Sequence, residues 1–491
     1  MGVIKRQGFK QSIVTLAATA LGAINTLLVY PMYLETTEIG LLSFLISTAG
    51  LFAPFIGLGH QTFAIRYFPE FHANGKDDRG FLTFMLLGLT AGFLIFAPLL
   101  LYFSDTVITY FPAKSPLSAR YFPFAVFFAL LILLQTFFAA YISNYKRIVI
   151  PSVLMQHAKV TQPALVILYF FNYISLNSLV WGLLFSYIAS VLGMVAYLYS
   201  LGGLKLQFNF SYFNRQRLRE MYTFAAYGTL GSLGSILATR IDIVMVTYLA
   251  SEHHTGVYAI AVFIAGVIEI PLMALNKITA PIISAAFKNN DLTHVAQLYK
   301  RSGLNLLIFG FALFLLIVLG LDNLFLFMKN GETFAAGKNA IILLGAAKLF
   351  DILTSVNGYI IGYSKYFRFN FYTMLILAGL NVVTNYFFIT AFAISGAALA
   401  TLATVIIFNT LKGLYIWYRF KMHPFTPQTF LLLGIGIVCF AIVFPLPDFG
   451  IPILDIAYKS LIFSGLYTAT CYYCKISEDF NIMVRKVLPL P

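Results

Sequence analysis

Apolar segments of similar length recur along almost the whole chain and are separated by short polar gaps. The hydrocarbon core of a bilayer is about 30 Å thick, and a helix needs about 20 mostly apolar residues to cross it. The segments have this length, so the pattern predicts a series of membrane-spanning helices. The expected spans cover approximately residues 11–33, 39–66, 81–104, 121–144, 153–173, 179–200, 222–249, 255–285, 302–328, 338–362, 370–391, 395–418, 427–446 and 452–474.

Composition indicates a lipid environment for most of the surface. Hydrophobic residues make up 60% of the 491 residues and charged residues only 10%, whereas soluble globular proteins carry about 25% charged residues. The spans leave no room for a large soluble domain. We therefore predict an all-α integral membrane protein of about fourteen transmembrane helices.

The formal net charge of +14 is distributed in a way that predicts the orientation of the chain. The basic residues fall in the short gaps between spans, as the positive-inside rule describes, and not in a patch suited to nucleic acid. With a cytoplasmic N-terminus, most of the 32 Lys and Arg residues, Lys412 among them, are assigned to the cytoplasmic face. An even number of spans then returns the C-terminus to the cytoplasm. The opposite face receives Lys114, Arg120, Lys329, Lys338 and Lys459.

Short sequence features of the first half recur in the second half in the same order and at a nearly constant offset. This recurrence predicts duplication of a unit of six spans. Because six is even, both copies enter the membrane in the same orientation, and a pseudo-two-fold axis along the membrane normal relates them. The matching features are Tyr33-Leu34 with Gly40-Leu41 and Tyr248-Leu249 with Gly256-Val257, then Pro54 and Pro271, then Tyr141-Ile142 with Tyr145-Lys146 and Tyr359-Ile360 with Tyr363 and Lys365.

The repeat divides the chain into four regions. Residues 1–204 form an N-terminal six-helix lobe, 205–221 an interfacial linker, 222–420 a C-terminal six-helix lobe, and 421–491 an appendix of two extra helices with the tail. Transporters built from such repeats bind substrate between the two lobes and rock one lobe against the other. We therefore expect the substrate cavity between the lobes.

Pro54 and Pro271 lie inside their expected spans. A proline in a helix interior removes one backbone hydrogen bond and kinks the helix. Two roles remain open for these prolines, a fixed structural kink and a hinge for gating.

Ionisable side chains are concentrated in the expected spans of the second half. An ionised residue at the centre of a membrane helix costs about 2.5–3.5 kcal/mol. Six of them without partners would cost roughly 15–20 kcal/mol, more than the stability of a typical protein, about 5–15 kcal/mol. They must therefore pair with one another or face water. The group comprises Arg240, Asp242, Glu269, Lys277, Lys348 and Asp351.

Spacing along the helices limits the pairs that these residues can form. Lys348 and Asp351 are three residues apart on one helix, so they can pair directly near the middle of the membrane. Arg240 and Asp242 are two residues apart, point to different faces, and need other partners. Two roles remain open for the group: ion pairs that only hold helices together, and charges that line a polar transport pathway.

No motif for catalysis or nucleotide binding is present in the sequence. It contains no P-loop, no H-E-x-x-H, no G-x-S-x-G and no zinc-ligand spacing. Cys471 and Cys474 form a C-x-x-C inside an apolar stretch, which is typical of ordinary membrane cysteines. The outer loop near 105–120 is too short for the catalytic loop of a membrane glycosyltransferase or polymerase, the main alternative class. We expect no enzyme activity, no cofactor and no metal site.

Several motifs together resemble a known family. In the first half they are Gly40-Leu41-Leu42, Pro54-Phe55, Gly57-Leu58-Gly59 and Arg66-Tyr67-Phe68-Pro69-Glu70. In the second half they are Arg240-Ile241-Asp242, Gly256-Val257-Tyr258-Ala259 and Gly396-Ala397-Ala398-Leu399-Ala400-Thr401. They resemble the polysaccharide-biosynthesis, or lipid-linked oligosaccharide, flippases of the multidrug/oligosaccharidyl-lipid/polysaccharide exporter superfamily. The resemblance extends over most of the spans and includes the two-lobed repeat.

The resemblance implies a flippase of the bacterial cytoplasmic (inner) membrane. Such a protein moves undecaprenyl-diphosphate-linked oligosaccharide to the outer leaflet for O-antigen, capsule or exopolysaccharide biosynthesis. The implied partners are H+ or Na+, membrane lipid, and a polysaccharide polymerase or glycosyltransferases, with no nucleic acid. Other exporters of the superfamily stay open as alternatives. Drug/cation antiporters usually carry an acid in the first span, and lipid II flippases carry arginines in the first two spans, where this chain has Asn25 and His60.

Roles for the intramembrane residues follow from this resemblance. Cations would bind the diphosphate, and His60 would face them from the first lobe, at the place equivalent to Lys277. Protonation of a carboxylate, or sodium binding to it, would release a lysine to meet the anionic headgroup. The candidate substrate-binding residues are Arg240, Lys277, Lys348 and His60, and the candidate coupling carboxylates are, in order, Asp351, Glu269 and Asp242.

Overall fold

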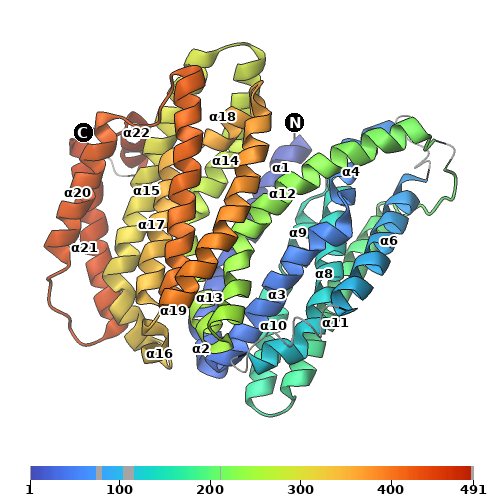
Figure 1. Ribbon diagram of the computed structural model, residues 1–491. Helices are drawn as coiled ribbons and strands as arrows, with labels where there is room; N and C mark the ends of the chain where they lie inside the picture. The colour runs from blue at the N-terminus through green and yellow to red at the C-terminus, as the bar shows by residue number, and fades with distance from the viewer. Residues whose placement is uncertain (1, 73–79, 103–114, 211, 488–491) are drawn as a thin grey trace. The chain divides into compact units, whose positions relative to one another are not determined.

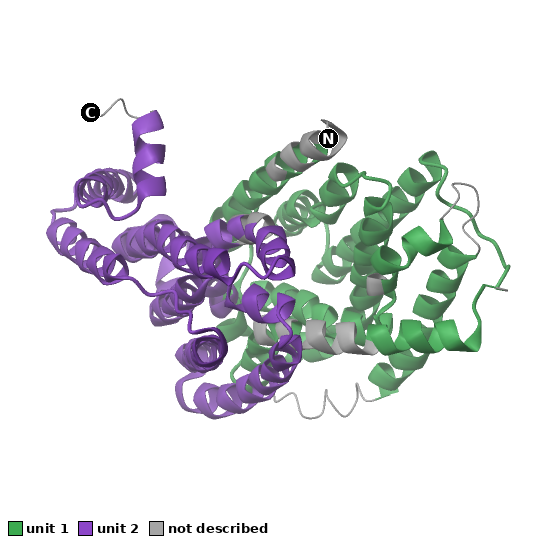
Figure 2. Cartoon of the chain, turned by 90° about the horizontal axis from the view of Figure 1, so that it is seen from above, with its two compact units in different colours: residues 1–256 green, residues 257–491 purple. Residues whose placement is uncertain are grey.

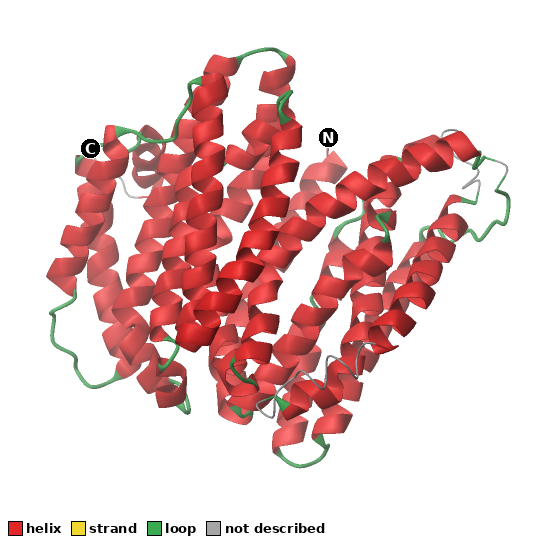
Figure 3. Ribbon diagram, in the orientation of Figure 1, coloured by secondary structure: helices red, strands yellow, loops and turns green. Residues whose placement is uncertain are grey.

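The computed structural model describes residues 2–72, 80–102, 115–210 and 212–487 (Figure 1). The chain divides into two compact units, unit 1 (Met1–Gly256) and unit 2 (Val257–Pro491), which Figure 2 shows in different colours. Helices make up most of the described ranges, and no strand occurs in them (Figure 3). A bilayer core offers no water to backbone amides and carbonyls, so a chain of this hydropathy satisfies them within helices.

Unit 1 combines long helices with short pieces that interrupt or follow them. Its core lies where α3, α8, α11 and α12 pack together. The helices of unit 1 are α1 (Gly2–Ile24), the π-helix η1 (Asn25–Val29), α2 (Tyr30–Tyr33), α3 (Thr36–Gly57), α4 (His60–Arg66), α5 (Phe68–Phe71), α6 (Phe81–Tyr102), α8 (Pro116–Ser143), α9 (Val149–Met155), α10 (Ala158–Phe170), α11 (Leu176–Ser200), α12 (Arg215–Leu249) and the beginning of α13 (Glu252–Gly266).

Unit 2 begins within α13 and runs to the end of the chain. Its central helices are α15, α17 and α19, which pack along one another. The remaining elements are η2 (3-10, Val267–Glu269), α14 (Ile270–Lys288), α15 (Leu292–Phe327), α16 (Gly331–Ala335), α17 (Lys338–Thr354), α18 (Asn357–Tyr363), α19 (Phe367–Phe420), α20 (Pro427–Val443), α21 (Pro452–Tyr473) and α22 (Glu478–Val487).

The helices confirm the membrane class expected from hydropathy. Within the described ranges, eight helices are long and apolar enough to cross a membrane, and the pair α17 and α18, bent by 46°, makes up to nine. The chain is therefore a multi-pass α-helical membrane protein. α19 covers two of the expected spans, because it continues through Ala393, whose φ of 49° and ψ of −122° mark a kink between them. The count of fourteen spans, the four regions and their boundaries stay predictions.

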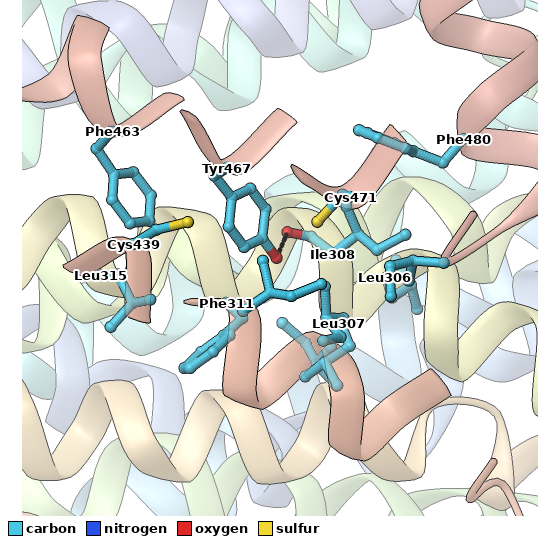
Figure 4. Close-up of a cluster of buried hydrophobic side chains, with 14 of the residues drawn as sticks. Leu306, Leu307, Ile308, Phe311, Leu315, Cys439, Phe463, Tyr467, Cys471 and Phe480 are labelled. Carbon is cyan, nitrogen blue, oxygen red and sulfur yellow. Dashed lines mark hydrogen bonds between the residues drawn. The ribbon is translucent and has the colours of Figure 1, made fainter. Parts of the chain in front are cut away.

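The helices that follow residue 421 share a hydrophobic core with the rest of unit 2. α20 and α21 pack on α15 and on each other. The Tyr467 hydroxyl donates a hydrogen bond to the Ile308 carbonyl oxygen at 3.0 Å within this core. Van der Waals packing and hydrogen bonds between helices hold membrane helices together. The buried side chains in Figure 4 include Leu306, Leu307, Phe311, Leu315, Cys439, Phe463 and Cys471.

Candidate functional site

An ion pair joins η2 to α17 in the interior of unit 2. Lys348 Nζ lies 2.5 Å from Glu269 Oε2, and the two side chains are 28% and 27% exposed. Glu269 is the last residue of the short 3-10 turn that interrupts the path from α13 to α14. Pairing lowers the cost of keeping both charges within membrane-spanning helices.

The predicted pair between Lys348 and Asp351 is not formed, so that prediction is wrong. Lys348 binds Glu269, whereas Asp351 Oδ1 accepts a hydrogen bond from Asn409 Nδ2 at 3.0 Å. A spacing of three residues brings two side chains to one face of a helix. A lysine side chain is long enough, however, to reach a carboxylate on a neighbouring element, and η2 provides one.

Asn409 connects Asp351 to the break between α17 and α18. Asn409 Oδ1 accepts a hydrogen bond from Asn357 Nδ2 at 2.8 Å, and these two asparagines are 1% and 5% exposed. α17 ends at Thr354, and Ser355 has the unusual φ of 46° and ψ of −110° before α18 begins. Interrupted membrane helices free backbone polar groups, and transporters place ion and substrate sites at such interruptions.

Lys412 is a buried residue that the sequence analysis does not single out. The charge census places it on the cytoplasmic face, but the structure places it within α19, only 3% exposed, with Nζ 3.9 Å from the centre of the Phe408 ring. The side of the membrane on which it lies stays a prediction. The signal that could have found it is its position inside the expected span 395–418.

Arg240 and Asp242 lie on α12 in unit 1. The Arg240 side chain passes so close to Gly50 of α3 that a Cβ added at residue 50 would lie 2.8 Å from Arg240 Cδ. The Arg240 guanidinium also interacts electrostatically with Tyr187 of α11. Asp242 is buried, at 6% exposure. No ion pair joins Arg240 to Asp242 in the described part of the chain, in agreement with the different helix faces expected for them.

His60 is fully buried in unit 1. Its Nδ1 lies 2.9 Å from the Gly57 carbonyl oxygen, and a Cβ added at Gly88 of α6 would lie 1.9 Å from its Nε2. In this conformation the ring has no exposed surface for a ligand, so its predicted contact with substrate requires these neighbours to move, and that role stays a prediction. The rings around it belong to Phe63, Phe84 and Tyr222.

The two prolines lie next to interruptions of their helices. α3 ends at Gly57, shortly after Pro54, and the next two residues, Leu58 and Gly59, have φ of 44° and 78° before α4 begins. Pro271 follows η2 in the first turn of α14, where its missing N–H leaves no intrahelical bond unmade. A hinge role for both prolines stays a prediction. Lys277 is in α14, but its side chain lies outside the described residues.

Two glycines of the repeat make a close contact inside unit 1. A Cβ added at Gly40 of α3 would lie 2.1 Å from the Glu252 carbonyl oxygen, and one added at Gly256 would lie 2.0 Å from the Thr36 carbonyl oxygen. Thr36 lies one helical turn before Gly40, and Glu252 lies one helical turn before Gly256. Equivalent positions thus contact each other reciprocally, as two-fold related surfaces do. Small residues allow helix backbones to approach this closely.

The fold is shared with solved transporter structures. Lipid II flippase MurJ in an inward closed conformation is 16% identical, with a TM-score of 0.69 over 94% of this chain and 99% of that chain. An inward-facing multidrug resistance MATE family transporter of the MOP superfamily is 12% identical, with a TM-score of 0.59 over 84% and 94% of the two chains. A MOP superfamily transporter from Pyrococcus furiosus is also 12% identical, with a TM-score of 0.57 over 85% and 95%. At such identities the likeness establishes the fold alone.

No curated protein sequence matches the chain. A family model described as polysaccharide biosynthesis protein matches residues 9–287, which is more than half of the 491 residues. The family expected from the sequence motifs is thereby confirmed. This protein belongs to the polysaccharide biosynthesis protein family.

Proposed function

We propose that this protein is a flippase that moves undecaprenyl-diphosphate-linked oligosaccharide from the inner to the outer leaflet of the bacterial cytoplasmic membrane. The observation that carries the proposal is a polar network inside unit 2 of a member of the polysaccharide biosynthesis family, formed by Glu269, Lys348, Asp351, Asn357 and Asn409. Ionisable groups are expensive in a bilayer, and membrane proteins keep them where ions or polar substrates pass.

The cations of the network would bind the diphosphate of the substrate. Lysine and arginine are the residues that form charge-assisted hydrogen bonds to phosphate oxygens. Lys348 is the best-defined candidate, because its ammonium group is held by one carboxylate and its side chain is still 28% exposed. Arg240 and Lys277 are the further candidates in α12 and α14.

Ion-gradient coupling would act through the carboxylates Glu269 and Asp351. Glu269 binds Lys348 at 2.5 Å, so neutralising Glu269 would free the ammonium group for the diphosphate. Asp351 forms no ion pair within the described residues and receives one hydrogen bond from a neutral amide. It can therefore bind a proton or Na+ without breaking an ion pair, which makes it the leading coupling carboxylate, ahead of Glu269 and Asp242.

Two other transport functions have named representatives among the structures that share this fold, a lipid II flippase and multidrug transporters. The first spans favour an oligosaccharide-linked substrate over these. Asn25 and His60 stand where lipid II flippases carry arginines, and Asn25 is 5% exposed and donates a hydrogen bond to the Lys159 carbonyl oxygen at 2.7 Å. The alternative that is not a transporter is a membrane glycosyltransferase or polymerase.

Reconstituted vesicles test the proposed function. The purified chain is placed in liposomes that contain undecaprenyl-diphosphate-linked oligosaccharide, and the sugar in the outer leaflet is measured with an added glycosidase. We expect protein-dependent flipping that an imposed H+ or Na+ gradient accelerates. If only lipid II or a cationic drug is moved, one of the alternatives replaces the proposal.

A variant at Asp351 tests the coupling separately. Asp351→Asn is expected to abolish the response to the gradient while substrate binding persists. Asp322→Asn is the matched control, because Asp322 is an exposed carboxylate of the same unit, 67% accessible and paired with Lys338. An Asp351→Asn variant that flips substrate at the normal rate and still responds to the gradient would show that Asp351 is structural.

Orientation is tested by cysteine labelling. With both termini in the cytoplasm, the exposed residue Asn330 faces the outside and the exposed residue Leu206 faces the cytoplasm. In a chain with Cys474 replaced by Ser, Asn330→Cys should react with an impermeant maleimide in intact cells, and Leu206→Cys only after lysis. The reverse result would invert the proposed topology.

A further inference from the structure

Lys412 is buried in the interior of α19 and not at its end. It lies within α19, which continues for two further turns to Phe420, so about 12 Å of helix separates it from the helix end. Lysines near helix ends normally extend to the headgroups and water. Lys412 does not, because it is only 3% exposed.

The ammonium group of Lys412 has no hydrogen bond and no ion pair among the described residues. Its only close polar interaction is with the face of the Phe408 ring, whose centre is 3.9 Å from Nζ. On its other side, a Cβ added at Gly358 of α18 would lie 3.6 Å from Nζ. An aromatic face compensates only part of the cost of burying an ammonium group. A carboxylate partner would compensate this cost more fully.

The candidate carboxylate partner is Asp351. Lys412 lies three residues after Asn409 on the same helix, and Asn409 donates to Asp351 Oδ1 at 3.0 Å. The Lys412 and Asp351 charges already interact electrostatically. The other charged groups that act on Asp351 are Lys348 on the same helix and Glu269 on η2, and these two neutralise each other at 2.5 Å. Asp351 and Lys412 are thus a carboxylate and an ammonium in one interior, neither in an ion pair with any described residue.

We propose that Lys412 is a tethered competitor for the coupling cation at Asp351. When the cation leaves, the Lys412 ammonium pairs with the Asp351 carboxylate. When H+ or Na+ binds, Lys412 withdraws to the Phe408 ring, the arrangement seen here. The inference rests on the proposed coupling at Asp351 and adds the group that displaces the ion. Asn357, whose side-chain oxygen has no hydrogen bond among the described residues, provides a further oxygen ligand for Na+ next to the broken helix.

The proposed competition predicts the direction in which cation affinity changes when Lys412 is replaced. A neutral residue at position 412 removes both the competing ammonium and its repulsion of the cation, so the cation should bind more tightly. Transport should slow, because release of the cation loses the group that replaces it. A purely structural Lys412 would instead lower stability and leave cation affinity unchanged.

The test uses the full-length chain purified in detergent, with 22Na+ as the probe. Lys412→Met is expected to lower the half-saturating Na+ concentration about tenfold, equivalent to about 1.4 kcal/mol. If the coupling ion is H+, the variant instead moves half-maximal transport in vesicles to higher pH by about one unit. Lys412→Arg, which keeps the charge, should restore most of the wild-type behaviour. Unchanged or weaker cation affinity in Lys412→Met overturns the proposal, as does a wild-type chain that responds to neither ion.

Lys421→Met is the matched control. Lys421 is the C-cap residue of the same helix, and its Nζ is also above the aromatic ring four residues earlier, 4.8 Å from the centre of Trp417, but it is exposed. We expect this variant to bind the cation as the wild type does.

Folding is checked with a double variant. Asp351→Asn leaves Lys412 without its acceptor and should lower the melting temperature, and adding Lys412→Met should recover most of the loss. Independent, additive losses would contradict the pairing. Cation binding is measured without the lipid-linked substrate. The inference about Lys412 can therefore hold even if the chain does not flip oligosaccharide. Flipping of oligosaccharide can likewise be confirmed even if Lys412 does not affect cation binding.

Discussion

Lys348 in unit 2 and His60 in unit 1 have opposite surroundings. Unit 2 holds a polar network, defined here as Glu269, Lys348, Asp351, Asn357 and Asn409, next to an interrupted helix. Unit 1 holds an aromatic cluster, defined as Phe63, Phe84 and Tyr222 around His60. In the proposed mechanism, the polar network takes up or releases an ion by exchanging partners.

The aromatic cluster cannot accept a charge in the same way. His60 Nε2 is buried and has no hydrogen-bond partner among the residues that the structure describes, and burial without a partner disfavours a charged group. In the sequence, His60 and Lys348 look alike, because each is an ionisable residue inside an expected span. Their surroundings differ: Lys348 is paired with a carboxylate and partly exposed, whereas aromatic rings enclose His60.

The largest effect is expected from breaking the ion pair of the polar network. Glu269→Gln leaves Lys348 without its carboxylate, which should reduce flipping at least tenfold and destabilise the chain by about 3 kcal/mol, less than for a fully buried pair because both side chains are partly exposed. The readouts are vesicle flipping and thermal melting in detergent. In the double variant Glu269→Gln, Lys348→Gln, stability should recover while flipping does not. Recovery of both would make the pair purely structural.

A smaller loss is expected from Asn409→Leu. The change removes the donor to Asp351 and the acceptor of Asn357, and leaving a buried donor unsatisfied costs about 2 kcal/mol. Gradient-driven flipping should weaken with it. Thr390→Ala, at an exposed position of α19 whose hydroxyl bonds only to its own helix, is the control and should change neither quantity. Equal effects of the two variants would exclude a special role for Asn409.

The aromatic cluster is tested through Gly88. Gly88→Ala would place a Cβ 1.9 Å from His60 Nε2, so the ring must move, and we expect a loss of about 1–2 kcal/mol in melting experiments. Gly379→Ala is the matched control, because residue 379 is also in a membrane helix and a Cβ there meets nothing within 4 Å. That substitution should be neutral or slightly stabilising. A tolerated Gly88→Ala would show that the cluster opens more easily than its packing indicates.

The smallest effect is expected at an exposed ion pair. Arg301 and Asp479 lie 2.7 Å apart, with side chains 60% and 41% exposed, and such pairs contribute about 0.2–1 kcal/mol. Partial burial raises the pKa of Asp479, but hydrogen bonds from Asn305 and Arg301 and the Arg301 charge outweigh it, so the pKa lies below its ordinary value of 3.8. A lowered pKa in the folded state stabilises the chain above pH 3.8, and this stabilisation is lost as pH falls through the folded-state pKa.

Thermal melting at two pH values measures this contribution. Asp479→Asn should lower the melting temperature slightly near pH 6 and make no difference well below the pKa of the carboxyl group. A difference that persists in acid would show that Asp479 acts through packing and not through its charge.

Hydropathy predicted the parts of this structure that depend on consecutive residues. The apolar segments are helices, and the kink at Ala393 falls between the two expected spans 370–391 and 395–418. The motif shared by Gly40 and Gly256 has a physical basis in the structure, because both glycines lie where a Cβ would collide with a backbone carbonyl. The same reasoning also predicted that charges within spans need partners, and Glu269 and Lys348 are indeed paired.

The choice of partners was decided by tertiary structure. Sequence spacing favoured Asp351 for Lys348, but η2 brings Glu269, 79 residues away along the chain, within 2.5 Å. Lys412 was assigned to the cytoplasm by its place near the end of a span, yet its neighbours on α18 and α19 leave it 3% exposed. Helix formation and membrane insertion depend on local sums over neighbouring residues, which a sequence displays directly. Pairing and burial depend on distances between residues far apart in the chain, and only the packing of the helices sets those distances.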